Sequence, residues 1–600
     1  MSARIRRAIR KKTMPATASK SHVLFRARMM LGGLAALAAV IGAPAHARES
    51  MAVAAPFEVG ESPAGNYLAA LIAGIDRDTF AAATFFREAL RFDPRNPQLI
   101  ERAFVANMAN GDFDAAFSFA QRLLKIDANN GLANLALGIR AIKAKQWKKA
   151  REHLAKGGAG RQRDLTATML IAWSHVGSGE SRRALEMVDN LREESFAAFR
   201  DYQAALIADV AGNVGEATKR MKAAYSAEKM TLRMVDAYGR FMSQRGDADE
   251  AKRAFAAFDA ALPRHPLVDA AQATLNAGKK LDPLVRNAEQ GASEVLYGLG
   301  AAGGRQGDEL AAMIYLRLAL FIAPKNDLAI MTLADIYERL KQNERAIDTY
   351  ELVEDDSPMR ATADIQSALA LEMMGRNDDA STRLNDIVAR NPQDEEALGA
   401  LGNLQRSRKQ FAEAAETYGK ALAATTKPEK ARWPLYYFRG IAYERSKRWP
   451  LAEADFKKAL ELSPDQPLVL NYLGYSWVDQ NMNLDEAFKM LRRAVELRPQ
   501  DGYIVDSLGW ALYRLGRYDE AMKELEKAID LKPADPVIND HLGDVYWRVG
   551  RKLEAQFQWN HARDLKPEPE DLEKILKKIE HGLTDDKPAS AEAETKKNGG

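Results

Sequence analysis

Three copies of one pattern lie between Pro467 and Pro567: Leu-Asn-Tyr-Leu-Gly-Tyr-Ser-Trp at Leu470 to Trp477, Asp-Ser-Leu-Gly-Trp-Ala-Leu-Tyr at Asp506 to Tyr513, and Asp-His-Leu-Gly-Asp-Val-Tyr-Trp at Asp540 to Trp547. The glycines of the last two copies are 34 residues apart. A fixed period of this length is typical of a repeated pair of helices. The pattern therefore predicts a chain built from one recurring helix-turn-helix unit.

The sizes of the recurring residues agree with a helix pair. In the unit that begins at Pro536, the small residues Gly543, Ala555 and Ala562 fall at the 8th, 20th and 27th places. Small side chains at these places let two antiparallel helices approach closely. Gly550 is expected to end the first helix in the left-handed conformation, and Pro567 to close the second. Each unit is therefore expected to form two packed helices.

The set of spaced positions resembles the tetratricopeptide repeat (TPR) family, because six or more places recur together. The resemblance implies an all-α TPR α-solenoid superhelix. The 8th place recurs from Ala70 to Gly239 and, after a break, from Gly300 to Gly543. We therefore predict about fourteen repeats, six before the break and eight after it.

The register divides the chain into segments. The break leaves two interpretations open, an irregular joint between two arrays or one badly worn repeat. We predict a flexible leader at 48–62, a degenerate N-terminal array at 63–262, the irregular joint at 263–292, a C-terminal array at 293–569, a capping helix at 570–583 and a disordered tail at 584–600.

Residues 1–47 have the pattern of a secretory signal peptide. They contain nine basic residues and no acidic one, then an apolar run from Met29 to Ala43 and the small-residue site Ala45-His46-Ala47. This pattern predicts cleavage before Arg48 and a soluble periplasmic protein. The alternative is an uncleaved anchor, and Met14 is a possible true start. The run of 15 residues is short for a membrane span.

Catalytic motifs are missing from the sequence. There are no cysteines, which excludes disulfides and thiol chemistry. Neither Gly-x-Ser-x-Gly nor a phosphate-binding loop occurs, and Gly300 to Gly307 lacks the required Lys-Ser/Thr. The repeats leave no stretch for a catalytic domain, and the net charge of +3 does not indicate nucleic-acid binding. We predict no enzyme activity, catalytic residue, metal, cofactor, nucleic acid or small-molecule substrate.

The resemblance also implies a binding groove. In TPR proteins the first helices line a concave face, with places 2, 5, 9, 12 and 13 directed into it. The candidate groove residues are Tyr437, Arg445, Asn471, Tyr475, Tyr503, Asp506, Trp510, Tyr513, Arg514, Asp540, Asp544, Trp547 and Arg548. Aromatic and arginine side chains of this kind often carry binding energy. The alternative is that these side chains hold neighbouring repeats together.

The segments Trp433 to Gly440 and Leu470 to Tyr475 resemble exported TPR proteins of Gram-negative bacteria. The resemblance implies a periplasmic scaffold or adaptor that binds proteins or peptides. The partners that it implies are an envelope protease and cell-wall hydrolases. The alternative is a membrane-anchored envelope assembly or export factor whose repeats lie in the cytoplasm. In that case the uncleaved signal segment would be the contact with the membrane.

Overall fold

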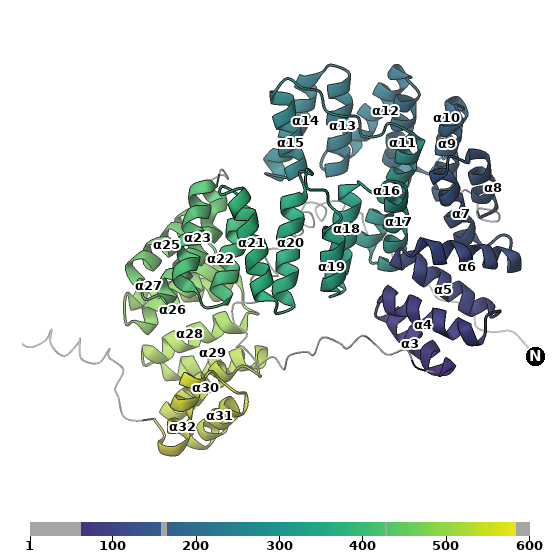
Figure 1. Ribbon diagram of the computed structural model, residues 1–600. Helices are drawn as coiled ribbons and strands as arrows, with labels where there is room; N and C mark the ends of the chain where they lie inside the picture. Colours follow the sequence, from purple (N-terminus) through teal and green to yellow (C-terminus); the bar gives the residue numbers. More distant parts are fainter. Residues whose placement is uncertain (1–59, 61, 158–164, 192, 426–428, 584–600) are drawn as a thin grey trace, which may run out of the picture. The chain divides into compact units, whose positions relative to one another are not determined.

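The chain folds into α-helices. The computed structural model describes residues 60, 62–157, 165–191, 193–425 and 429–583, which form 30 α-helices, two short 3-10 helices and no strand. The predicted all-α solenoid of paired helices is confirmed (Figure 1). The predicted signal peptide, most of the predicted leader and the predicted C-terminal tail lie outside the described residues.

Six helix pairs precede the break in register. They are α3 (Pro63–Ile75) and α4 (Thr79–Phe92), α5 (Pro97–Asn110) and α6 (Phe113–Ile126), α7 (Gly131–Lys143) and α8 (Trp147–Gly157), α9 (Leu165–Gly177) and α10 (Ser181–Asp189), α11 (Ala197–Val210) and α12 (Val214–Ala227), and α13 (Leu232–Gln244) and α14 (Ala248–Ala261). A single helix, α15 (Pro266–Asn276), follows and packs on α13 and α14. The 3-10 helix η1 (Glu194–Phe196) precedes α11.

Eight helix pairs follow the break. They are α16 (Ala288–Gln306) and α17 (Glu309–Ile322), α18 (Asp327–Arg339) and α19 (Asn343–Tyr350), α20 (Arg360–Met373) and α21 (Asn377–Arg390), α22 (Glu395–Ser407) and α23 (Phe411–Ala424), α24 (Trp433–Arg445) and α25 (Trp449–Leu462), α26 (Pro467–Asp479) and α27 (Leu484–Leu497), α28 (Gly502–Arg514) and α29 (Tyr518–Leu531), and α30 (Pro536–Arg548) and α31 (Lys552–Asp564). The 3-10 helix η2 (Glu429–Arg432) precedes α24, and α32 (Pro569–His581) follows the last pair.

The glycine at the 8th place is explained by close packing within a pair. A Cβ atom at Gly509 would lie 2.6 Å from Leu525 Cγ, and one at Gly543 would lie 2.5 Å from Trp559 Cδ1. Either distance is too short for two carbon atoms, so the larger residue of the second helix needs a glycine opposite it. The turn after α30 contains Gly550, whose φ of +86° is the left-handed conformation expected there.

The described chain divides into two compact units between Pro464 and Asp465. The N-terminal unit contains α3 to α25 and the C-terminal unit contains α26 to α32. The boundary of the predicted arrays at residues 292 and 293 falls inside α16. The break in register and the division into compact units therefore occur at different places in the chain.

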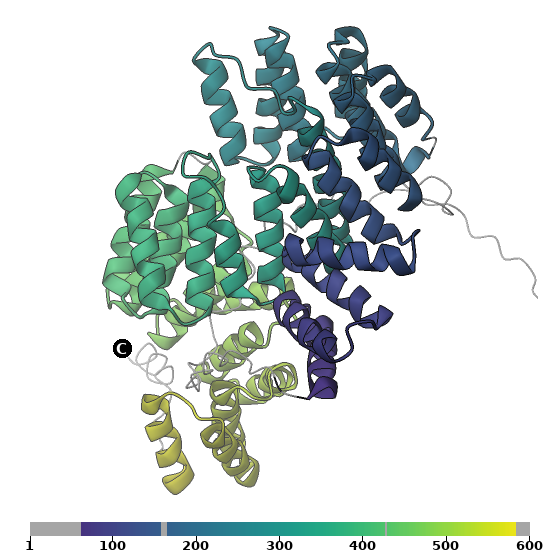
Figure 2. The same ribbon diagram turned by 45° about the vertical axis from the view of Figure 1, so that its right-hand side comes forward.

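In the N-terminal unit, α16 and α17 pack on helices that lie far earlier in the sequence. α16 contacts α9 and α11, and α17 contacts α5 and α7 (Figures 1 and 2). The four contacted helices are each the first helix of a pair, and we call the surface they form the first-helix face. Farther along the chain, Gln342 Nε2 donates to the Arg77 carbonyl at 3.0 Å, and Arg345 donates to Thr79 Oγ1 at 3.1 Å. Residues after the register break therefore pack on the early repeats and cover their first-helix face.

Two glycines allow α16 to lie close to this face. There is no room for a Cβ atom at Gly291 because the Trp173 ring occupies that position, and a Cβ atom at Gly298 would lie 2.9 Å from the Phe199 ring. Trp173 is fully buried, and its indole Nε1 donates to Gln203 Oε1 at 2.9 Å. The contact between α16 and the first-helix face is therefore part of the core.

The segment 263–292 contains α15, a non-helical stretch at 277–287 and the first turn of α16. This stretch is held by side chains and by backbone hydrogen bonds. Leu281 and Val285 are buried, and the Leu281 N–H donates to Ser243 Oγ at 2.9 Å. The register is lost here because α15 has no second helix of its own pair.

Candidate functional site

The side chains of α28 predicted to face the groove lie on one side of that helix. Trp510 stacks on Tyr513 of the same helix, with ring centroids 4.8 Å apart, and on His541 of α30, with centroids 4.1 Å apart. Arg548 of α30 donates through Nε to Tyr513 Oη at 3.4 Å. Trp510 and Tyr513 therefore join the first helices of two neighbouring pairs.

His541, which takes part in this stack, also forms a buried pair with Asp506. The His541 Nδ1 atom lies 2.9 Å from Asp506 Oδ1. Burial acts to lower the pKa of His541, but the charge and hydrogen bond of Asp506, with the charges of Asp540 and Asp544, outweigh burial and raise the pKa above its ordinary value. Sequence reasoning did not select His541, because its partner lies on another repeat.

The acidic candidate residues of α30 form ion pairs with a lysine of α32. Lys578 of α32 donates to Asp540 Oδ2 and to Asp544 Oδ2, both at 2.8 Å, and Asp544 Oδ1 accepts from Trp559 Nε1 at 2.9 Å. Burial and the charge of Asp540 raise the pKa of Asp544, and Lys578 acts in the opposite direction. Asp540 and Asp544 thus attach α32 to the last pair.

Trp547 is also covered by the end of α32. Gly582, which follows that helix, lies so close to the Trp547 ring that there is no room for a Cβ atom. The Trp547 ring further contacts Trp559, with centroids 5.3 Å apart. The candidate positions on α30 therefore take part in packing at this end of the C-terminal unit.

Four candidate residues on α26 and α28 keep polar groups that the fold does not use. We call Asn471, Tyr475, Trp510 and Arg514 the α26–α28 cluster. Asn471 Oδ1 and Trp510 Nε1 are buried atoms without a hydrogen-bond partner among the described residues. Arg514 is half-buried and forms no ion pair or hydrogen bond with another described residue, although arginine usually finds one when desolvated.

The pKa of Tyr475 on α26 depends in part on the charge of Arg514 on α28. Burial raises the pKa of Tyr475, the charges of Asp506, Asp479 and Asp571 raise it further, and Arg514 acts in the opposite direction. Tyr475 on α26 therefore lies within electrostatic range of the Arg514 guanidinium on α28. The cluster brings together one cationic group, an indole N–H, an amide and a phenol.

The other candidate residues lie in different surroundings. Tyr437 of α24 is 2% exposed and contacts the rings of Phe438 and Phe456, so it belongs to the core of the N-terminal unit. Arg445 is exposed, with its guanidinium 5.3 Å from the centroid of the Phe411 ring. Tyr503 lies on the first turn of α28 and is 38% exposed. Neither Tyr437 nor Arg445 belongs to the compact unit that holds the α26–α28 cluster.

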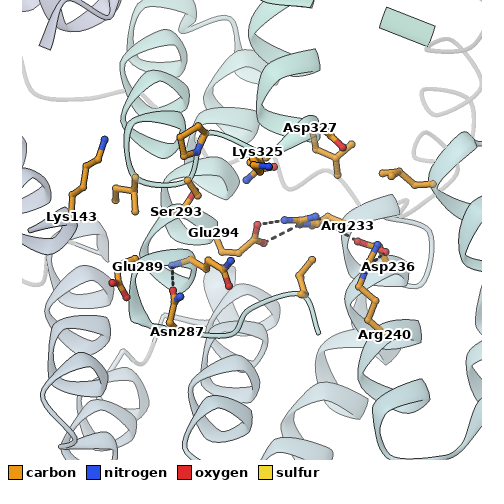
Figure 3. Close-up of a pocket in the computed structure, with 18 residues that line it drawn as sticks. Lys143, Arg233, Asp236, Arg240, Asn287, Glu289, Ser293, Glu294, Lys325 and Asp327 are labelled. Carbon is orange, nitrogen blue, oxygen red and sulfur yellow. Dashed lines mark hydrogen bonds and ion pairs between the residues drawn. The ribbon is translucent and has the colours of Figure 1, made fainter. Parts of the chain in front are cut away.

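A cavity of about 670 Å³ lies in the N-terminal unit, where residues from α13, α15, α16 and the α17–α18 connection meet (Figure 3). Sequence reasoning did not find it, because Arg233 and Glu294 are 61 residues apart and belong to different repeats. The Glu294 carboxylate accepts from Arg233 Nε at 3.0 Å and from Tyr202 Oη at 2.7 Å.

Several charged groups of this cavity are paired with one another or with nearby residues. Asp236 pairs with Arg233 and with Arg240, and Lys325 Nζ lies 2.6 Å from Glu354 Oε1. Burying Arg233, Asp236 and Glu294 is tolerated because each of them has a partner of opposite sign, whereas the Lys325 side chain stays exposed. The cavity thus lacks the unused polar groups found in the α26–α28 cluster.

Within the described residues, no group of three or more His, Asp or Glu side chains is arranged to hold a metal ion. The same part of the chain contains no helix that is both long enough and apolar enough to cross a membrane.

Three family profiles match separate parts of the chain. Residues 509–550 match the family described as TPR repeat, residues 331–451 match the N-terminal TPR repeats region of Psidin, and residues 107–173 match the family described as tetratricopeptide repeat. A TPR repeat-containing protein of Pseudomonas aeruginosa is 28% identical over 198 residues, which are 32% of this chain and 32% of that protein. The chain thus spans about a third of that relative's length.

Solved structures also match over long stretches at low identity. The Cut9–Hcn1 hetero-tetramer of APC/C matches 87% of this chain and 97% of its own, with 15% identity and a TM-score of 0.37. Yeast Tom70 matches 87% of this chain and 95% of its own, with 13% identity and a TM-score of 0.29.

Proposed function

Because the chain is a tetratricopeptide repeat protein, a scaffold that binds proteins or peptides, we propose that the α26–α28 cluster is where it binds a segment of its partner. The proposal rests on one observation: the cluster presents a cationic, an indole and an amide group that the fold leaves unused. An unsatisfied buried polar atom costs about 1 to 3 kcal/mol, and a ligand that supplies its partner recovers this free energy.

Two other surfaces are less suited to this role. The first-helix face of the early repeats is covered by α16 and α17. The acidic positions of α30 are neutralised by Lys578. The α26–α28 cluster is the place where predicted groove residues combine partial exposure with unused hydrogen-bonding capacity.

The cluster also suggests the chemistry of the bound segment. The Arg514 guanidinium suits a carboxylate, which it can bind through two parallel hydrogen bonds. The Trp510 N–H can donate to a backbone carbonyl, and the Asn471 side chain can accept from a backbone N–H. We therefore propose an extended peptide that carries an acidic side chain or a free C-terminal carboxylate next to an exposed backbone.

A displayed library of random peptides, selected on the full chain, tests this site. The peptides selected should carry an acidic group, and the substitution Arg514→Gln should weaken their binding at least 10-fold, or about 1.4 kcal/mol. Arg517→Gln is the matched control, because Arg517 is an exposed arginine of the same unit whose guanidinium pairs with Glu520. If the parent chain, R514Q and R517Q all bind the selected peptides equally, the α26–α28 cluster is not the binding site.

We further propose that the protein acts in the periplasm as a non-enzymatic adaptor. Support comes from the basic and apolar pattern of residues 1–47 and from the resemblance to exported envelope proteins. An envelope protease or cell-wall enzymes are the partners that this resemblance suggests. The second candidate remains a membrane-anchored assembly or export factor, and the state of the N-terminal segment separates the two.

A further inference from the structure

α32 occupies the place of a first helix but buries far fewer residues than one. It begins 33 residues after α30 begins, and it packs on α31 as the first helix of a further repeat would (Figure 1). Among their described residues, α30 has nine that are buried and α32 has one, Ile575. Because buried apolar area supplies much of the free energy that holds a helix in place, α32 is attached less firmly than α30.

Ion pairs join α32 to α30. Lys578 Nζ lies 2.8 Å from a carboxylate oxygen of Asp540 and 2.8 Å from one of Asp544. Asp544 is buried and the Lys578 side chain is 18% exposed, so these charges are largely withdrawn from water. Removing Lys578 without a substitute would leave a buried carboxylate unpaired, which is costly. Another ammonium or guanidinium group would restore the ion pairs, so the exchange of one cation for another costs little.

An aromatic ring lies on the same side of α30 as these carboxylates. Asp540, Asp544 and Trp547 follow one another at intervals of four and three residues, which places them on one side of the helix. Gly582 covers the Trp547 ring, and Trp559 of the last pair contacts it from α31. Departure of α32 would therefore expose an ordered ring beside two carboxylates. This combination suits a basic side chain with apolar neighbours.

We propose that Asp540, Asp544 and Trp547 form a binding site for a helical segment of a partner protein that carries a lysine or an arginine. α32 is the internal occupant of this site, and the partner segment displaces it. The partner's basic side chain takes the place of Lys578, and its apolar side takes the place of Ile575. Amphipathic helices are common ligands of grooves between helices. The site is separate from the α26–α28 cluster.

A synthetic peptide with the sequence of residues 569–582 is the probe, because the structure shows how this sequence fits the site. The K578Q chain, whose own α32 is held less firmly, should bind the labelled peptide at least 10-fold more tightly than the parent chain does, or by about 1.4 kcal/mol. Fluorescence anisotropy measures this. K577Q is the matched control and should bind as the parent chain does, because Lys577 is 69% exposed and pairs with Glu573 of the same helix.

A second peptide tests the need for a cation. The same sequence with Lys578→Gln should bind the K578Q chain at least 10-fold more weakly than the unchanged peptide does. If the K578Q chain binds the two peptides equally, or binds neither, Asp540 and Asp544 are not a site for a basic side chain and the proposal is wrong.

Hydrogen exchange in the full chain measures the release of α32 directly. The hydrogen-bonded amides of α32 should exchange at least 10-fold faster than those of α30, because α32 opens without unfolding of the last pair. Equal exchange in the two helices would show that α32 is a fixed part of the unit, which contradicts the proposal. These measurements do not use Arg514 or the peptides selected for the α26–α28 cluster, so their failure would leave that proposal standing.

Discussion

At the scale of single residues, His541 makes the C-terminal unit sensitive to pH. Its imidazole faces Asp506 of α28 and the carboxylates of Asp540 and Asp544 on its own helix, and these raise its pKa. A group whose pKa is raised on folding stabilises the folded state most at pH values below its unfolded pKa, which is about 6.5 for histidine. This stabilisation is lost as the pH rises through the pKa of the folded state. Lys578 of α32 also pairs with Asp540 and Asp544.

We therefore expect the C-terminal unit to be more stable at pH 6 than at pH 8. The substitution His541→Gln should reduce the difference in melting temperature between these two pH values, measured by circular dichroism, because glutamine keeps a donor for Asp506 and cannot titrate. His581→Gln is the control, since that side chain is 65% exposed. The same pH difference in H541Q as in the parent chain would contradict the assignment.

The repeat spacing predicted which residues face the groove. It did not predict which of these residues pack against other parts of the fold. Trp510 and Trp547 were both predicted to face the groove. The end of α32 covers Trp547, whereas the Trp510 N–H has no hydrogen-bond partner among the described residues. Such differences depend on contacts between repeats, and the spacing within one repeat does not report them. The contribution of each residue to binding stays a prediction.

At the scale of helices, α16 makes a contact that tolerates no added atom. A glycine within a helix costs about 1 kcal/mol relative to alanine, so Gly291 needs a structural reason, and the Trp173 ring provides it. Gly291→Ala should destabilise the N-terminal unit by about 1 to 3 kcal/mol through overpacking. Denaturant unfolding followed by circular dichroism measures this change.

The matched control is another helical glycine in the same unit. A Cβ atom at Gly399 of α22 would meet nothing within 4 Å. Gly399→Ala should therefore stabilise the unit by about 0.5 to 1 kcal/mol. Equal effects of G291A and G399A would show that the contact between α16 and Trp173 is less tight than described.

The existence of α16 and α17 as a pair followed from the register, but their docking site did not. The 34-residue period reports contacts within a pair and between neighbouring pairs. Gly291 and Trp173 belong to repeats that are not neighbours in sequence, and the glycine that permits their contact has no counterpart in the repeat pattern. Sequence periodicity could therefore predict the solenoid but not its covered face.

At the scale of the whole molecule, the N-terminal segment decides between the two proposed locations. We expect the protein isolated from its source cells to begin at or close to Arg48, because a signal peptidase cuts after small residues such as Ala45 and Ala47. N-terminal sequencing of the purified chain measures this directly. A chain that retains residues 14–47 would favour the membrane-anchored alternative.

The sequence predicted the number of helix pairs, six and eight, and the structure has the same two sets. It did not predict that the compact units divide between Pro464 and Asp465. The loss of register near α15 marks a missing helix, whereas a compact unit is defined by packing. Because α16, α17, Gln342 and Arg345 contact the early repeats, residues on both sides of the register break belong to one unit.

The covered first-helix face also sets an order of events during synthesis of the chain. Gln342 and Arg77, which are hydrogen-bonded in the N-terminal unit, are 265 residues apart. A ribosome that adds 5 to 20 residues per second needs roughly 15 to 50 seconds to synthesise this length. During the first part of that time the early repeats exist without α16, the helix whose Gly291 contacts Trp173. The first-helix face of the unfinished chain is therefore exposed until α16 and α17 have been made.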